Sequence, residues 1–478
     1  STINLIQILS KIFEKIELNN IRLFTTEKFL DARLLNYFYD AKGIDKCYLI
    51  VDNINHQLDQ VCPDNNTKSE KNNSDIDFEV IFESECKKFY SLLSIIQKVI
   101  NGTIFLLKKD SQNSDDTTNE KTEKEKIIKY YDIMHTFLSK TMPIFQKIVS
   151  HDIRKFDTNH LNHFFQIIGN SQEIDFPVSD TDKFPLTYNL YDPSISSILS
   201  TFLKSSFFDK HLYALKSFST LCDKLESHYQ NNHDYFQLPP DKRQGRHLLV
   251  SFTDKDALFK SITANFEQIQ SLNFNKEFGD PLGTIYAFIM LNSGNIITND
   301  FIKKLWSDIQ FIHAADQPSF YMMIEKVIKE MNGKDKYEIV DFILNHISSS
   351  SKQLCINLLE FLYNVAMNLK SKEFKQPFLK IRDLFWSVSF DETETKQEFD
   401  IKEFAMKKLI GLCYIYSNEI IDQIVTEKLP KVQKEESDEK DKEFIIELLL
   451  HSFNKQEEIS SDICNQIGSS MIRILPVN

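Results

Sequence analysis

The sequence contains little of what marks enzymes, membrane proteins or turn-rich β domains. Its 478 residues include only 10 Gly and 12 Pro, which is too few for a chain built from many tight turns. It contains no glycine-rich phosphate loop, no HExxH zinc motif, no paired CxxC and no GxSxG nucleophile elbow. Long apolar runs are also absent, so we expect no transmembrane helix and no membrane partner.

Cysteine is scarce and scattered. No two of the thiols share the spacing of a metal site or a redox motif, and their number is odd: Cys47, Cys62, Cys86, Cys222, Cys355, Cys413 and Cys464. We interpret them as buried free thiols, because none lies in a glycine-containing turn beside a base. His160 and His163 stand one helical turn apart, but no third ligand follows. We therefore expect no catalytic residue, no cofactor and no metal.

Acidic residues outnumber basic residues in the chain. The chain has 56 Lys and Arg against 69 Asp and Glu, a net charge of −13 at pH 7. This balance disfavours nucleic acid as a partner and favours proteins. The basic string of Lys242, Arg243 and Arg246 is interpreted as a solvated loop rather than a phosphate site. The N-terminus shows no secretory signal pattern, so a cytoplasmic protein is predicted.

Hydrophobic residues are abundant, at 42%, and recur at three- and four-residue spacing along most of the chain. In the middle of the chain this spacing predicts helices at about 301–312, 320–331 and 337–347. Gly333 is predicted to end a helix as a C-cap. Because one helix pair cannot bury its own apolar face, such pairs stack. The predicted fold is all-α, an armadillo/HEAT-like right-handed α-solenoid of stacked helix pairs.

Helix starts and long helices are also predicted. Asp192-Pro193 and Asp280-Pro281 each place proline at the first position of a helix, where its missing N–H does no harm. Apolar spacing predicts two long helices, at 78–107 and 127–149, and we expect them to pack antiparallel.

Polar segments divide the chain into three predicted regions. Residues 1–155 form an N-terminal helical region with polar inserts at 63–76 and 109–125. Residues 156–432 form armadillo-like repeats, and residues 433–478 hold a charged linker and a further helix pair that is truncated. Helix pairs recur about every forty residues, without a residue-level consensus. A first residue other than Met indicates a piece of a longer protein.

Two parts of the sequence resemble a known family. They are YDPSISSILSTFLKSSFFDKHLYALKSFSTLCDKLESHY at 191–229 and the helix order of 285–416, with anchors such as Leu305-Trp306 and Phe361-Leu362. Both resemble the N-terminal armadillo-like region of the very large fat-facets-type ubiquitin-specific proteases. The resemblance implies a non-catalytic scaffold region of a cysteine-type deubiquitinase (ubiquitin carboxyl-terminal hydrolase) that binds ubiquitinated substrates or partner proteins. The family's cysteine and histidine boxes are absent, so no catalytic residue is carried over.

The candidate partner-binding residues lie on the middle helices and are Trp306, His313, Tyr337 and Trp386. Aromatic residues dominate interface hot spots, which is why they are chosen. The same helical spacing also fits core positions for Trp306 and Trp386, and that alternative stays open. The alternative function is a free-standing armadillo/HEAT adaptor or transport scaffold with no linked enzyme. The sequence leaves the oligomeric state open.

Overall fold

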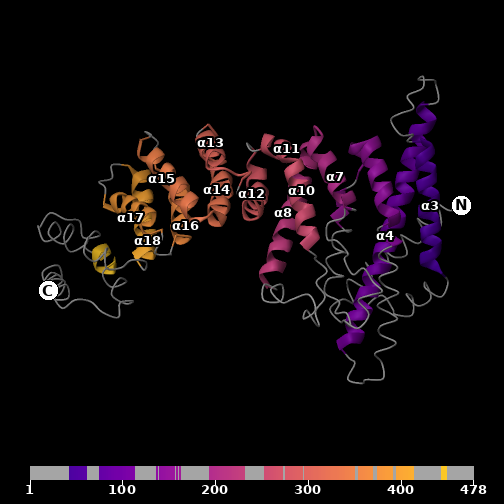
Figure 1. The fold of residues 1–478 in the computed structure, drawn as a ribbon, viewed down its shortest axis with the longest axis horizontal. Coiled ribbons are helices and arrows are strands. Elements are labelled where there is room, and N and C mark those ends of the chain that lie inside the picture. The colour runs from indigo at the N-terminus through magenta and orange to yellow at the C-terminus, as the bar shows by residue number, and fades with distance from the viewer. Residues whose placement is uncertain are drawn as a thin grey trace, which may run out of the picture. The chain divides into compact units, whose positions relative to one another are not determined.

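The computed structural model describes the chain in segments, at residues 42–61, 75–112, 136–156 without 138, 158–162 without 160, 193–231, 252–293 without 273–274, 295–349 without 310, 354–369, 374–390, 395–413 and 443–448. The chain divides into two compact units, Ser1–Gln270 and Ser271–Asn478, and each is considered by itself. Every regular element in the described segments is an α-helix or a short 3-10 helix (Figure 1). None of the described helices combines the length and apolar character that a membrane span requires. The boundaries predicted at 155 and 432 stay predictions.

The first unit is helical in its described part. Its elements are α3 (Gly43–Val61), α4 (Asp75–Gln112), the 3-10 helix η2 (Ile153–Lys155), α7 (Pro193–Lys204), α8 (Phe208–Asn231), α10 (Phe252–Ala264) and α11 (Phe266–Ser271), which ends at the unit boundary. Helix α7 starts at Pro193, as predicted. Helix α4 extends the predicted long helix at both ends, so residues 75–76 and 109–112 of the polar inserts are helical. Residues 1–41 of the predicted N-terminal helical region lie outside the described residues.

Aromatic rings connect the helices of the first unit. Phe89 of α4 packs edge-on against Phe145 with ring centroids 5.2 Å apart, and Phe145 packs in the same way against Phe156 at 5.4 Å. Two helical turns before Phe89, the ring of Phe82 packs against the ring of His151, with centroids 4.2 Å apart. Such ring pairs stabilise a core beyond the area they bury. Lower-numbered residues of α4 meet higher-numbered residues of the second helix. The predicted antiparallel packing is therefore confirmed for the part of the second helix that the structure describes, residues 136–151 without 138.

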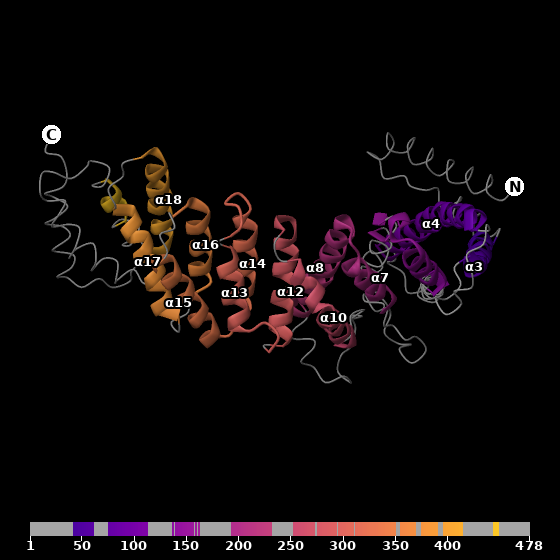
Figure 2. The ribbon, with the colours of Figure 1, turned by 90° about the horizontal axis from the view of Figure 1, so that it is seen from above.

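The second unit stacks its helices in two rows. Its elements are the 3-10 helix η5 (Lys276–Phe278), α12 (Gly279–Asn292), α13 (Asn299–Ile309), α14 (Gln317–Glu330), α15 (Gly333–Ser349), α16 (Ile356–Met367), α17 (Lys375–Phe390) and α18 (Lys396–Cys413). Helices α12, α14, α16 and α18 form one row, in which each contacts the next, and α13, α15 and α17 form the other (Figure 2). The predicted fold class, an all-α, armadillo/HEAT-like solenoid of stacked helix pairs, is confirmed.

The repeat length is visible in the first row. Helices α12, α14, α16 and α18 begin at Gly279, Gln317, Ile356 and Lys396, so successive starts are 38, 39 and 40 residues apart. A helix pair with its two connections needs about this many residues in HEAT and armadillo units. The predicted period of about forty residues is therefore confirmed in this unit.

Three of the polar contacts between successive repeats have the same separation in sequence. Asn299 Nδ2 donates to Glu338 (3.0 Å), and Asn364 Nδ2 donates to Glu325 (3.1 Å). Lys380 forms the corresponding ion pair with Asp341. The two members of each pair are 39 residues apart. Exposed pairs contribute little free energy, so their main effect is to fix how one repeat is aligned on the next.

Gly333 does not end a helix, and the predicted C-cap was wrong. Helix α14 ends at Glu330, and its C-cap Met331 has extended backbone angles. Gly333 is the first residue of α15. The Asn332 side chain accepts a hydrogen bond from the Asp335 N–H (3.1 Å). Asn332 therefore acts as the N-cap of α15, and Gly333 becomes the first residue of that helix.

The junction between α12 and α14 is a contact of backbones. A Cβ placed on Gly279 would lie 2.6 Å from the Ser319 carbonyl oxygen, and one on Gly283 would lie 2.9 Å from the Met323 Cα. The two glycines are four residues apart and so share one face of α12. The close approach therefore depends on the absence of side chains at both positions.

Lys326 of α14 closes the same junction with its ammonium group. Its Nζ donates to the Asp280 carboxylate and to the Thr284 hydroxyl, each at 2.8 Å. Asp280 lies in the first turn of α12, which begins at Gly279, two residues before Pro281, so the predicted helix start at Pro281 was wrong. Negative charge is favourable there because the helix N-terminus carries partial positive charge.

We expect Gly283→Ala to destabilise the protein. Alanine is ordinarily better than glycine in a helix by about 0.5–1 kcal/mol, but here the added methyl group must push two backbones apart, and overpacking costs about 1–3 kcal/mol. Urea unfolding should show a net loss of about 1 kcal/mol or more. Gly411→Ala is the matched control, since a Cβ there meets side-chain atoms of Tyr363, the hydroxyl at 2.7 Å and a ring carbon at 3.3 Å, and no backbone atom of another helix is among its nearest neighbours. Equal shifts of the two unfolding midpoints would contradict the backbone contact.

Candidate functional site

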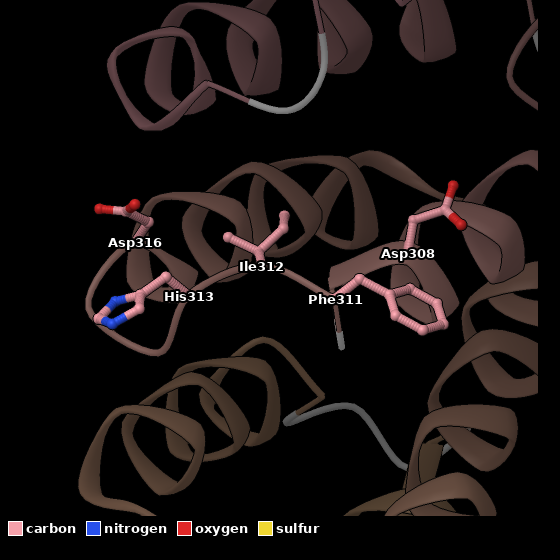
Figure 3. A pocket seen from close by; sticks show the side chains of 5 residues that line it. All are labelled: Asp308, Phe311, Ile312, His313 and Asp316. Atoms are coloured by element: carbon pink, nitrogen blue, oxygen red, sulfur yellow. The ribbon is translucent and has the colours of Figure 1, made fainter.

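The candidate site is the connection between α13 and α14. A hollow of about 550 Å³ lies there, lined by Asp308, Phe311, Ile312, His313 and Asp316. Figure 3 shows these side chains along one stretch of chain, with Asp308 and Phe311 at one end and His313 and Asp316 at the other. A volume of about 300–1,000 Å³ with mixed apolar and polar lining is typical of ligand sites.

Phe311 projects into solvent. It is 89% exposed, the largest exposed fraction among the large apolar side chains of the described residues. A ring left in water lacks the stabilisation of about 1.5–3 kcal/mol that its burial in the core would contribute. An aromatic side chain held outside the core in this way is available for contact with another molecule, and aromatic residues are frequent among interface hot spots.

The backbone around Phe311 is ordered by tight turns at the end of α13. The Phe311 N–H donates to the Asp308 carbonyl (3.1 Å), and the Ile312 N–H donates to the Ile309 carbonyl (3.0 Å). These bonds tighten the last turn and satisfy carbonyls that the helix end leaves free. The chain then leaves the helix direction, which carries Phe311 away from the apolar face of α13.

Gln317, the first residue of α14, ties this turn to the next helix. Its Nε2 donates to the Ile312 carbonyl (3.1 Å) and lies 3.5 Å from the Ile309 carbonyl. Its Oε1 accepts a hydrogen bond from the Tyr321 hydroxyl (3.1 Å). One side chain thus fixes the carbonyls on both sides of Phe311.

Tyr321 belongs to a stack of three aromatic rings, which holds its side chain in place. The ring centroids of Trp306 and Phe361 lie 5.5 Å apart with an interplanar angle of 26°, and those of Tyr321 and Phe361 lie 5.3 Å apart with an angle of 28°. The rings come from α13, α14 and α16. Burial raises the pKa of the Tyr321 phenol, so its hydroxyl keeps its proton and acts as the donor to Gln317.

His313 and Asp316 form the other end of the hollow. His313 Nδ1 accepts a hydrogen bond from the Ala315 N–H (3.2 Å), which places the proton of the neutral ring on Nε2. The Asp316 carboxylate pairs with Lys276 of η5 at 3.2 Å. Both members of this pair are partly exposed, so water screens their attraction.

The four residues chosen from the sequence do not gather in one place. Trp306 and Trp386 are only 6% and 5% exposed and lie in the core, where they offer little surface to a partner. Tyr337 is 41% exposed on α15, outside the hollow. His313 is the one that lines the hollow, and a partner contact through His313 or Tyr337 stays a prediction.

Sequence reasoning missed Phe311. It extended the apolar face of α13 to Ile312, whereas the helix ends at Ile309. The available signal was Pro318, which sits in the first turn of α14 and requires a break in the chain shortly before it. An aromatic residue in that break has no helix face on which to be buried.

The structure gives no support for metal binding at the hollow. Within the described segments, no three His, Cys, Asp or Glu side chains are grouped so that they could hold a metal ion. His160, His163 and the basic string at 242–246 lie outside the described residues. The chemistry available at the hollow is therefore that of an aromatic face, an imidazole and two carboxylates.

The second unit belongs to the class of α-helical repeat structures, and comparison with known proteins adds no closer assignment. No protein-family model and no curated protein matches the chain. One similar solved structure is a chain of the SYS-1/POP-1 crystal complex, with a TM-score of 0.23 and 10% sequence identity, over 98% of this chain and 90% of that chain. Similarity at this level carries no information about function.

We expect Gln317→Ala to loosen the turn that presents Phe311. The free energy that protects the Phe311 and Ile312 amides should fall by about 1 kcal/mol, the net value of a hydrogen bond, so their hydrogen exchange should become about fivefold faster. Tyr321→Phe keeps the ring stack but removes the hydroxyl, and its effect should be smaller. Unchanged exchange in the Gln317 variant would show that the turn is held without this side chain.

Proposed function

We propose that the chain is a helical-repeat scaffold that binds a protein partner through the α13–α14 connection. The observation that carries the proposal is Phe311, an 89% exposed aromatic ring on a turn that hydrogen bonds hold in one conformation. A preorganised aromatic anchor loses little conformational entropy when it binds, so more of its contact energy appears as affinity.

The stacked helices support this role in a second way. In a helical repeat each pair contacts only its neighbours, so the edges of successive repeats form a long continuous surface. Phe311 lies on a connection between two helices rather than within the stack. A partner can therefore reach it without disturbing the junctions between repeats.

A photo-crosslinking experiment tests the proposal. Benzoylphenylalanine at position 311 should crosslink one partner, and Phe311→Ser should then weaken binding of that purified partner by at least about tenfold, the loss expected of a hot-spot aromatic. Phe399, 40% exposed on α18, supplies the control for both the crosslinker and the serine substitution. Because Phe311 is exposed, its substitution should leave the urea midpoint nearly unchanged. Full binding by the Phe311 variant would overturn the proposal.

A narrower role is proposed from the sequence resemblance alone. In this role the scaffold is a region of a ubiquitin-specific cysteine protease and brings ubiquitinated substrates to a separate catalytic domain. The helix order of 191–229 and 285–416 supports it. The free-standing adaptor or transport scaffold is the alternative, and it shares the same surface.

A ubiquitin activity probe separates these two roles. If the narrower role is right, the native polypeptide labels with the probe and is much longer than this chain, while residues 1–478 alone do not label. A native polypeptide that ends near residue 478 and never labels would exclude the protease role and leave the adaptor.

A further inference from the structure

The charges of the α13–α14 hollow indicate what kind of side chain it accepts. Asp308 and Asp316 line the hollow together with the apolar side chains of Phe311 and Ile312. Among the described residues that line it there is no lysine or arginine, and the imidazole of His313 is its one basic group. A site with carboxylates beside an apolar face repels phosphate and acidic peptides and attracts a cation with an apolar stem.

Asp308 is the available carboxylate of the two. Asp316 already pairs with Lys276 at 3.2 Å. For Asp308, the described part of the chain supplies neither an ion pair nor a side-chain hydrogen bond; only its backbone carbonyl is engaged, by the Phe311 N–H. Figure 3 shows the Asp308 carboxylate and the Phe311 ring at the same end of the hollow.

An aromatic face next to a free carboxylate suits arginine better than lysine. The guanidinium group is planar, so it can lie over a ring and still direct two N–H groups at a carboxylate. The ammonium group of lysine is a strongly hydrated point charge that matches neither surface as well. The volume of the hollow, about 550 Å³, also leaves room for an apolar neighbour of the arginine against Ile312.

We propose that the hollow binds an arginine side chain of the partner protein, with the guanidinium over the Phe311 ring and paired with the Asp308 carboxylate. This inference rests on the proposed function, since it names the chemistry of the segment that the scaffold would bind. It also agrees with the chain's net charge of −13, which favours basic partner segments over acidic ones.

Short synthetic peptides test the inference on the full chain. 4-Fluorophenylalanine at position 311 provides a fluorine NMR signal, which is titrated with acetyl-Ala-Leu-Arg-Leu-Ala-amide and with the same peptide containing citrulline. Citrulline has the shape of arginine without its charge. We expect the arginine peptide to shift the signal and the citrulline peptide to bind about tenfold more weakly.

A double-mutant comparison assigns the charge contact to one carboxylate. Asp308→Asn should weaken the arginine peptide about tenfold and leave the citrulline peptide unchanged. Asp300→Asn removes the same charge from the first turn of the same helix and should change neither affinity. Because Asp300 is exposed, this variant controls for the effect of the chain's overall negative charge on peptide binding.

Each other outcome overturns the inference. Equal affinity of the two peptides, with Asp308→Asn without effect, would mean that only apolar contact operates; the inference then fails while the proposed function stands. Absence of any fluorine shift would exclude arginine binding at the hollow. The crosslinking result at position 311 would then decide the proposed function separately.

Discussion

The ring stack of Trp306, Tyr321 and Phe361 is the constraint on which the candidate site depends. It joins three helices of two rows, and burial raises the pKa of the Tyr321 phenol, so the hydroxyl stays protonated and donates to Gln317. Gln317 in turn donates to the Ile312 carbonyl of the turn. The exposed ring of Phe311 is therefore positioned through a chain of contacts that begins at buried rings.

The buried and the exposed aromatic residues differ in what their substitution would change. Trp306 contributes buried area to the ring stack, so its substitution would lower the stability of the fold and loosen the turn together. Phe311 is exposed, so its substitution should leave the stability of the fold nearly unchanged.

The helical class and the period could be predicted from apolar spacing, because that spacing reports directly which faces are buried. The residue-level repeat could not, since even the contacts that share a 39-residue separation use different residue types: Asn with Glu, Asp with Lys, and Glu with Asn. The spacing of these three contacts is the same, and several pairs of residue types satisfy it.

The site was only partly predictable for a related reason. His313, chosen from the sequence as a partner contact, lines the hollow and stays a prediction in that role, whereas Phe311 was hidden by an apolar pattern that continued past the true end of α13. Whether an apolar residue at a helix end is buried depends on the direction the chain takes next. That direction is set by Gln317 and its partners, which the local pattern does not contain.

The backbone contact between α12 and α14 has a mechanical consequence. Helices that touch only their neighbours in a row carry a pulling force through each junction in series. Junctions made by long side chains, such as Glu325 with Asn364, can lengthen by changes of rotamer. At the glycine junction the two backbones are in direct contact, and the side chain that can adjust there is Lys326. Since α14 also begins with Gln317, a force on the turn that carries Phe311 passes directly to this backbone contact.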